Sequence, residues 1–170
     1  MLFRSPVVLA LPEDMLTDRV SIADAGRYKP AQPSPGAAQM QELRDRLSHA
    51  KRPLMILGGG GWSAQAVGDI RSFAEAMNLP TGCSFRCQDL FDNLHPNYAG
   101  DVGIGINPKL AARVKNADLL LVVGARLGEM TTSGYTLLNI PVPQQTLIQD
   151  RKSTRLNSSH IQKSRMPSSA

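Results

Sequence analysis

Cysteine, aromatic side chains and long apolar runs are all scarce in this chain of 170 residues. Cys83 and Cys87 are the only cysteines, and together with His95 they are too few for a zinc site or a disulfide framework. We expect two reduced thiols, as in a cytoplasmic protein. Aromatic residues make up 5% of the chain, which argues against a nucleic-acid binder. Because no apolar run approaches the roughly 18 residues that span a membrane, we expect no membrane partner either.

The formal net charge of +5 would suggest an anionic partner, but it arises at the two ends of the chain. Residues 150–170 are rich in Ser, Lys and Arg, and the codons of a common short-read sequencing adapter would encode them around a variable index at 161–163. Residues 2–5 match the inner end of such an adapter, with Met1 as an alternative start codon. We therefore expect residues 1–5 and 150–170 to be adapter-derived, the latter disordered, with Gln149 at the boundary.

Without those ends the chain is formally neutral. The 19 Lys+Arg lose six members and the 14 Asp+Glu lose one, which leaves 13 of each. A neutral chain has no electrostatic footprint for nucleic acid, so we expect no nucleic-acid partner. The remaining residues, 6–149, are enough to bury one core.

A proline-rich stretch at 30–37 divides this segment, and we expect it to be an extended linker. Before the linker, residues 6–12 form a short apolar run typical of a buried strand. After it, apolar strands alternate with amphipathic helices. The strands are expected at 54–57, 80–85, 117–123 and from 146, and the helices begin near Met40, after Ser63 and after Asn107, with Val67, Ile70, Ala74 and Met77 on the buried face of the second. This order predicts a doubly wound α/β domain with a parallel sheet, cut short at its C-terminal end.

Two glycine-spaced loops come before predicted helices. Gly58–Gly61 joins a strand to a helix, where free backbone N–H groups and the positive helix end favour a phosphate. The same glycines are equally typical of a tight turn with close helix packing, since Ser63 takes the place of the third glycine in a dinucleotide fingerprint. The second loop, 100–106, carries a weaker signal of the same kind. In a doubly wound sheet such loops lie at the edge where ligands bind.

A third loop, Gly124-Ala125-Arg126, directly follows a buried strand. The planar guanidinium of Arg126 suits a phosphate or the edge of a flavin-type ring, unless it pairs with Glu129.

The other polar candidates have simpler interpretations. His49 follows the last turn of a helix and favours its C-terminus, and His95 lies in a loop with no nucleophile or carboxylate arrangement around it. Asp89 and Asp92 are expected in a solvated loop, and Trp62 is expected to be a packing residue.

Four segments occur in a characteristic order: PVVLALPEDML, GGGGW, HPNYAGDVG and NADLLLVVGARLGE. Together they resemble a thiamine-diphosphate-dependent enzyme of the acetolactate synthase type, over essentially all of residues 6–149. The resemblance implies that residues 6–29 end a pyrimidine-binding domain. It also implies that residues 38–149 form an incomplete, Rossmann-like central domain. In this family that domain holds FAD in acetolactate synthases, and ADP or no nucleotide in relatives.

The resemblance also implies a set of nucleotide contacts. They fall at Gly58, Gly59, Gly103, Ile104, Gly105, Gly124, Ala125 and Arg126. FAD-binding synthases continue Gly-Ala-Arg with Phe-Asp-Asp-Arg, whereas this chain continues with Leu127-Gly128-Glu129-Met130. Two flavin contacts are thus absent, so FAD is less expected here than in a biosynthetic acetolactate synthase.

The catalytic residues and metal ligands of the family have no counterpart in this chain. The glutamate that drives deprotonation of thiamine diphosphate would precede residue 6, and the Gly-Asp-Gly motif that holds Mg²⁺ would follow residue 149. The resemblance implies a parent enzyme that acts on a 2-keto acid as a homodimer or homotetramer, and a fragment that is inactive alone. A free-standing ADP- or FAD-binding α/β module is the alternative. If expressed as written, the chain would also be a partly folded fragment with an open sheet edge.

Overall fold

The computed structural model describes residues 9–26 and 34–150. They fall in two compact units, Met1–Gln32 and Pro33–Ala170. The first unit contributes a short 3-10 helix, η1 (Glu13–Thr17). The second contributes α1 (Ala37–His49), β1 (Pro53–Leu57), α2 (Ala64–Ala76), β2 (Thr81–Ser84), η2 (Gln88–Leu90), β3 (Tyr98–Val102), α3 (Pro108–Asn116), β4 (Leu119–Val123) and β5 (Thr146–Asp150).

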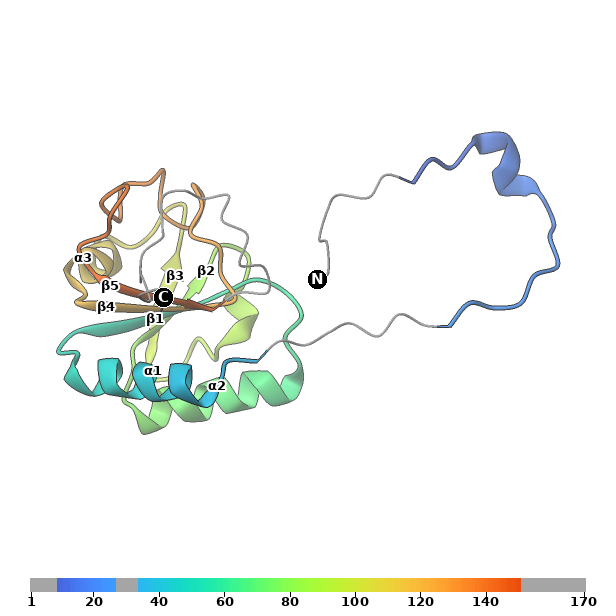
Figure 1. The fold of residues 1–170 in the computed structure, drawn as a ribbon. Helices are drawn as coiled ribbons and strands as arrows, with labels where there is room; N and C mark the ends of the chain where they lie inside the picture. Colours follow the sequence, from blue (N-terminus) through green and yellow to red (C-terminus); the bar gives the residue numbers. More distant parts are fainter. Residues whose placement is uncertain (1–8, 27–33, 151–170) are drawn as a thin grey trace, which may run out of the picture. The chain divides into compact units, whose positions relative to one another are not determined.

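Five parallel strands form a single sheet in the order β3-β2-β1-β4-β5 (Figure 1). The inner strands β1 and β4 are buried over almost their whole length. A strand covered on both faces needs apolar side chains at successive positions, which is why PLMIL and LLLVV show no polar alternation. The doubly wound, all-parallel fold predicted from the sequence is confirmed.

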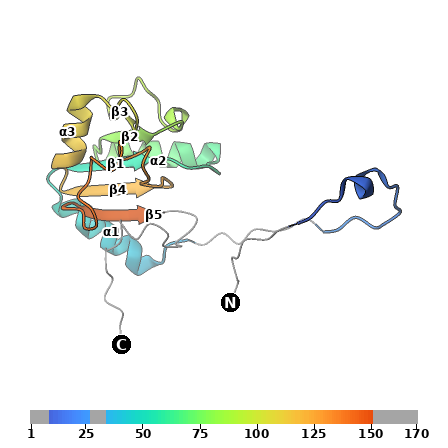
Figure 2. The ribbon, with the colours of Figure 1, turned by 90° about the horizontal axis from the view of Figure 1, so that it is seen from above.

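Helices cover both faces of this sheet (Figures 1 and 2). On one face, α1 and α2 contribute Leu47 and Ala74 to a core that includes Met55, Leu57 and Leu121. On the other face, α3 contributes Leu110 and Val114 to a core with Leu54, Ile56, Leu120 and Val122. Neighbouring side chains of one strand therefore enter opposite cores, as the pleat of a strand requires.

The chain reverses its direction across the sheet between β1 and β4. From β1 it runs through α2 to β2 and β3, and α3 then returns it to β4 on the other side of β1. β1 and β4 pair from Pro53 opposite Leu119 to Leu57 opposite Val123. At such a switch point the loops leaving the two strands diverge, and a ligand can bind beyond their carboxyl ends.

Two helices begin where the sequence predicts. The Ser63 hydroxyl accepts a hydrogen bond from the Ala66 N–H at 3.1 Å and caps α2. The Asn107 side chain accepts one from the Lys109 N–H at 2.9 Å, with Pro108 opening α3. The prediction for Met77 is wrong: its side chain is 43% exposed, because α2 ends at Ala76 and Met77 is the capping residue.

Strand β3 corrects the interpretation of residues 100–106 as a loop, because Gly100–Val102 belong to the strand. β3 lies at the edge of the sheet, where an uninterrupted apolar run is not needed and Asp101 is tolerated. The pairing with β2 is irregular between Thr81 and Gly82, and Gly100 has a φ of +119°. Gly100 allows this irregular pairing at the edge strand. Because glycine is typical of loops and rare in strands, the sequence pattern did not indicate a strand here.

The strand expected at 6–12 is not formed in its described part. Leu9 and Leu11 are 76% and 64% exposed and lie in irregular chain that leads into η1. A strand forms only where a neighbouring strand accepts its backbone hydrogen bonds. The described residues of this unit, 9–26, contain no strand that could act as such a neighbour. Of the linker expected at 30–37, residues 30–33 lie outside the described residues, and Ala37 already begins α1.

Strand β5 extends one residue past the predicted native boundary. Asp150 pairs with Val123, and its carbonyl accepts a hydrogen bond from the Gly124 N–H at 2.7 Å. This residue is thus part of the sheet rather than of a disordered tail, because strand pairing uses backbone groups whatever the side chain. Residues 151–170 lie outside the described part of the chain.

Within the two described segments, no helix has the length and apolar character needed to cross a membrane. The same residues bring together no group of three His, Cys, Asp or Glu side chains that could hold a metal ion.

Candidate functional site

The loops that leave β1 and β4 touch each other directly. The Gly58 N–H donates to the Val123 carbonyl at 3.0 Å, which continues the pairing of the two strands by one step. Gly59 and Gly124 have φ values of +75° and +73°, a conformation that side chains disfavour. A Cβ on Gly59 would overlap the Gly124 carbonyl oxygen, and a Cβ on Gly124 would overlap that of Gly58. Three of the predicted contact residues therefore meet at the switch point.

Gly58 has no room for a side chain, because β2 and the loop after β4 pack closely against it. A Cβ at this position would overlap the Ser84 hydroxyl and lie 2.8 Å from the Ala125 Cβ. The tight-packing interpretation thus holds for Gly58. Ser84, at the carboxyl end of a predicted strand, is a site residue that position in the sheet alone could have identified.

The next glycines are open to solvent. Gly60 and Gly61 are exposed, and no atom lies within 4 Å of where their Cβ atoms would be. In the described residues, the backbone N–H groups of Gly59, Gly60 and Gly61 make no hydrogen bond. They precede the first turn of α2, whose helix dipole favours negative charge. The loop is closely packed at Gly58 and leaves exposed backbone N–H donors at its tip, where the sequence predicts a phosphate.

Two side chains hold this loop from its flank. The Trp62 indole N–H donates to the Gly58 carbonyl at 3.0 Å, and the Cys87 thiol donates to the Gly59 carbonyl at 3.8 Å. Trp62 also packs against the core below α2, as predicted for a packing residue. Both contacts use carbonyl oxygens, so they leave the N–H groups of the loop unoccupied.

The Gly124-Ala125-Arg126 loop presents one side chain to solvent. Ala125 is 1% exposed, and its carbonyl accepts a hydrogen bond from the Gln149 side chain at 2.8 Å. Arg126 is exposed, and among the described residues it makes no ion pair with Glu129. The alternative of a paired surface arginine is therefore not what the structure shows. Nothing in the sequence signals the Gln149 contact, because it depends on the register of β5.

The second predicted loop, 100–106, is not part of the same contact. A Cβ on Gly103 would lie 3.2 Å from the Met130 carbonyl and 3.3 Å from the Phe85 Cβ, rather than near Gly58 or Gly124. Ile104 is 57% exposed, and Gly105 has a φ of +74° with open space around it. Gly103, Ile104 and Gly105 thus extend the same edge of the sheet, two strands away from β1.

The two cysteines differ in their surroundings. Burial raises the pKa of Cys83 to about 12, and the neighbouring Cys87, Asp101 and Asp89 add to the effect. Cys83 is therefore an inert core thiol. Both cysteines are unpaired, which agrees with the reduced state expected from the sequence.

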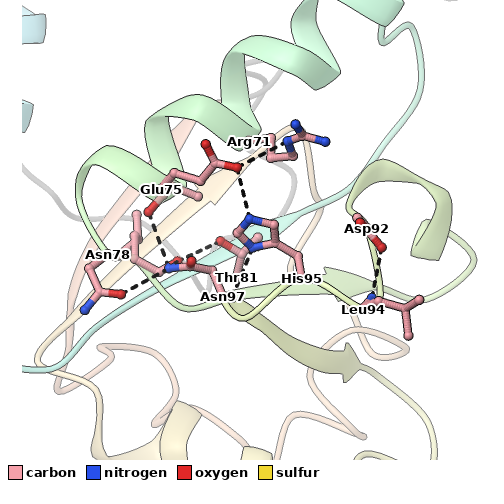
Figure 3. Close-up of polar contacts among 10 residues, drawn as sticks. Arg71, Glu75, Asn78, Thr81, Asp92, Leu94, His95 and Asn97 are labelled. Atoms are coloured by element: carbon pink, nitrogen blue, oxygen red, sulfur yellow. Dashed lines mark hydrogen bonds and ion pairs between the residues drawn. The ribbon is translucent and has the colours of Figure 1, made fainter.

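The remaining polar candidates lie away from the glycine loops. His49 contacts the Asp45 carbonyl at 2.6 Å near the end of α1, as predicted for a helix C-terminus. Asp89 and Asp92 are exposed, in agreement with a solvated loop. The expectation that no carboxylate lies near His95 is wrong, because its ring contacts the Glu75 carboxylate of α2, twenty residues earlier in the chain (Figure 3).

Comparison with known proteins shows which family this domain resembles. A family model described as the thiamine pyrophosphate enzyme central domain matches residues 40–166. Sulfoacetaldehyde acetyltransferase of Rhodobacter capsulatus is 29% identical over 132 residues, which cover 77% of this chain and 22% of that protein. The large subunit of acetolactate synthase isozyme 2 of Escherichia coli is 31% identical over 111 residues, which cover 65% of this chain and 20% of that protein.

A solved structure agrees with these relatives. The X-ray structure of a protein from Mycobacterium smegmatis, described as a thiamin diphosphate-dependent enzyme, aligns with a TM-score of 0.50 at 30% identity. The alignment covers 60% of this chain and 20% of that chain. The present chain spans about a fifth of the length of the relatives it matches.

Proposed function

Since the chain belongs to the thiamine pyrophosphate enzyme family through its central domain, we propose that it is the nucleotide-binding part of a larger enzyme that acts on a 2-keto acid. An acetolactate synthase among the relatives supports this substrate class. Relatives with other activities, such as an acetyltransferase, share the same region. The choice of keto acid and acceptor therefore lies outside this domain.

One observation carries the nucleotide-binding role: the free N–H groups of Gly59, Gly60 and Gly61 lie at the switch point, where the β1 loop meets the Arg126 loop. A diphosphate needs several donors and a positive charge, and helix N-termini and arginine provide both. Gly124 keeps the two loops in contact, so the donors and the guanidinium share one edge. The Gly103–Gly105 loop is available for the nucleoside end of the ligand.

We propose ADP rather than FAD as the nucleotide. After Arg126 the chain turns inward, and Leu127 is 3% exposed within the core of the α3 face. The residues that follow lack the acidic pair and the second arginine of the flavin-binding pattern. The loop therefore supports the phosphate contacts that ADP and FAD share but not the additional contacts of a flavin.

Thiamine diphosphate and Mg²⁺ would be held by other parts of the parent enzyme. Thiamine diphosphate supplies a carbanion and an electron sink when bound. No residue of this chain fits that role, because the sequence has no Gly-Asp-Gly and the described residues have no metal-ligand group. We accordingly propose that the chain alone has no turnover, and that the parent enzyme is a cytoplasmic homodimer or homotetramer.

The binding of ADP and FAD to the 170-residue chain, measured by isothermal titration calorimetry, tests the proposal. ADP should bind more tightly than FAD, and Arg126→Met should weaken ADP binding by about tenfold, because one charge-assisted contact is lost. Arg113→Met is the matched control, since Arg113 is also exposed but lies in the last turn of α3, at the opposite edge. Equal affinities of the two variants would contradict the site.

A free-standing ADP-binding module is the second candidate, and the open N–H cradle supports it equally. Resequencing the source DNA across both ends, with adapters trimmed, distinguishes the two. A frame that continues into an upstream glutamate and a downstream Gly-Asp-Gly favours the enzyme. A frame that ends after residue 170 as written favours the module.

A further inference from the structure

His95 lies between α2 and the loop that leads into β3, and both of its ring nitrogens are in contact (Figure 3). Its Nε2 is 3.0 Å from the Glu75 Oε1, and its Nδ1 is 3.1 Å from the Asn97 backbone nitrogen. The side chain of His95 is 15% exposed, compared with 45% for Glu75. This cluster lies outside the nucleotide site proposed above.

The contacts define the tautomer of the ring. A backbone N–H can only donate, so Nδ1 must be the unprotonated nitrogen that accepts from Asn97. The ring hydrogen is then on Nε2, where it donates to the Glu75 carboxylate. A neutral imidazole satisfies both neighbours, whereas an imidazolium has no lone pair left for the Asn97 N–H.

Asn97 connects this ring to the sheet. Its side-chain amide donates to the Leu79 and Ala74 carbonyls, at 3.3 and 3.4 Å, near the C-terminal end of α2. Its own carbonyl accepts a hydrogen bond from the Thr81 N–H at 2.8 Å, at the start of β2. A change at the Asn97 backbone therefore reaches the place where the edge strand β3 begins to pair.

The groups around His95 set the sign of the effect. From α2, Glu75 faces the ring and Arg71 shares the same Glu75 oxygen at 3.3 Å, while from its own loop Phe91 lies edge-on at 5.3 Å between centroids. The Asp92 carbonyl accepts the His95 N–H at 3.0 Å, and the Tyr98 ring stacks on Phe91. Because Glu75 is exposed and already paired, its extra attraction for an imidazolium is small.

We propose that His95 is a pH-sensitive latch on the Asn97 backbone: the neutral ring accepts the Asn97 N–H at Nδ1, and the protonated ring releases it while Nε2 keeps its contact with Glu75 of α2. Acid favours the protonated ring, which has no acceptor for the Asn97 N–H, so the latch should be more open at low pH than at high pH. Asn97 directly precedes β3, the strand that leads to the Gly103–Gly105 loop at its other end.

Amide hydrogen exchange in the full chain, corrected for the intrinsic rate at each pH, measures the latch. Protection of the Asn97 amide should fall by about tenfold from pH 8 to pH 5, which corresponds to the loss of one partly buried hydrogen bond. The Thr81 amide should follow with a smaller change. Constant protection over this range would overturn the proposal.

Two substitutions of the same residue separate the ring nitrogens. His95→Asn places an oxygen near the position of Nδ1 and cannot titrate, so it should keep the Asn97 amide protected at every pH. His95→Gln places its amide near the position of Nε2 and leaves Asn97 without an acceptor, so protection should be low at every pH. His49→Asn is the control and should keep the wild-type pH dependence. Identical behaviour of the two His95 variants would contradict the latch.

A measurement on the unmodified chain covers the case in which a variant does not fold. The ¹⁵N chemical shifts of the His95 ring report its tautomer directly. At pH 8 they should show hydrogen on Nε2 and a lone pair on Nδ1. Hydrogen on Nδ1 at this pH would overturn the proposal without any substitution.

Discussion

The loops at the two ends of the parallel strands differ in how their backbone groups are satisfied. We call the end where β1 and β4 begin the closed edge and the end where they finish the open edge, and we expect the closed edge to serve stability and the open edge to serve binding. At the edge where β1 and β4 begin, side chains occupy the backbone groups of the loops. The Asp118 carboxylate accepts the Lys51 N–H at 2.7 Å and the Arg52 N–H at 2.9 Å, and the Arg52 side chain donates to the Asn116 carbonyl at 2.8 Å. At the opposite edge, the N–H groups of Gly59, Gly60 and Gly61 are open.

The same contrast holds at the end of α3. The Gln144 side chain donates to the Lys115 carbonyl at 2.7 Å, and Gln145 donates to the carbonyls of Val114 and Lys115 at 3.1 Å. The Lys115 carbonyl at the end of the helix is thus satisfied by side chains, and the Val114 carbonyl, which also accepts the Ala117 N–H, gains a second donor. The exposed N–H groups therefore lie at the carboxyl ends of the strands, where we propose that a nucleotide binds.

Replacing Gly124 should disrupt the contact between the loops after β1 and β4, and we expect it to reduce stability more than any other substitution that we propose. Gly124→Ala puts a side chain on a residue with a φ of +73° and against the Gly58 carbonyl. We expect a loss of about 3–5 kcal/mol in the free energy of unfolding, measured by urea denaturation. Gly60→Ala is the matched control, because nothing lies within 4 Å of its Cβ position, and it should change stability by less than about 0.5 kcal/mol. Equal losses would show that the two glycines do not differ in packing.

Removing Asp118 should weaken the closed edge without affecting nucleotide binding. Asp118→Ala leaves two backbone N–H groups without their acceptor, and we expect a loss of about 1–2 kcal/mol in the free energy of unfolding. The ADP affinity should stay within about twofold of the unmodified chain. A parallel loss of ADP affinity would contradict the separation of the two edges.

The pH dependence of stability should also change in Asp118→Ala. Burial raises the pKa of Asp118, but the hydrogen bonds from the Lys51 and Arg52 N–H groups and the charge of Arg52 outweigh burial and leave it below its usual range. A carboxyl whose pKa is lower in the folded state stabilises the fold above its unfolded pKa, near 4, and loses this contribution as the pH falls. The difference in stability between wild type and variant should therefore shrink below about pH 4.

Cys83 and Cys87 should differ in their reactivity toward a disulfide reagent, and modification of the reactive thiol should have little effect on stability. Because burial raises the pKa of Cys83 to about 12, this thiol stays protonated at pH 8 and should not react with a disulfide reagent in the folded chain. Cys87 is partly exposed and should react. We expect one thiol to be titrated in buffer and two in urea. If both thiols react rapidly in buffer, Cys83 is accessible in the folded chain, and its burial in β2 does not protect it.

Residue patterns were sufficient for the parts of the fold that depend on local chemistry. The apolar runs PLMIL and LLLVV identified β1 and β4, and the capping signals at Ser63 and Asn107 identified where α2 and α3 begin. The strand expected at 80–85 matches β2, although its sequence TGCS is not apolar. These features follow from burial on both faces of the sheet and from hydrogen bonds within four residues. The glycine loops at 58–61 and 124–126 follow β1 and β4 as predicted, whereas the loop expected at 100–106 begins only after Val102.

Features that depend on a distant neighbour were missed or misplaced. β3 has the sequence YAGDV, and only its pairing with β2 makes it a strand. The strand expected at 6–12 lacks a partner in its described part, and the contact of Gln149 with the Ala125 carbonyl depends on the β5 register. Long-range pairing decided each case, and periodicity within a segment carries no information about it.

The central claim is that the open edge of the sheet binds a nucleotide diphosphate. An ADP titration of the ¹⁵N-labelled chain, followed through its backbone amide signals, tests it most directly. The account predicts that the amides of Gly59–Gly61 and of Gly124–Arg126 shift in proportion to bound ADP, while those of Lys51, Arg52 and Asp118 do not. Shifts confined to the Lys51 and Asp118 edge, or no shifts at millimolar ADP, would contradict it.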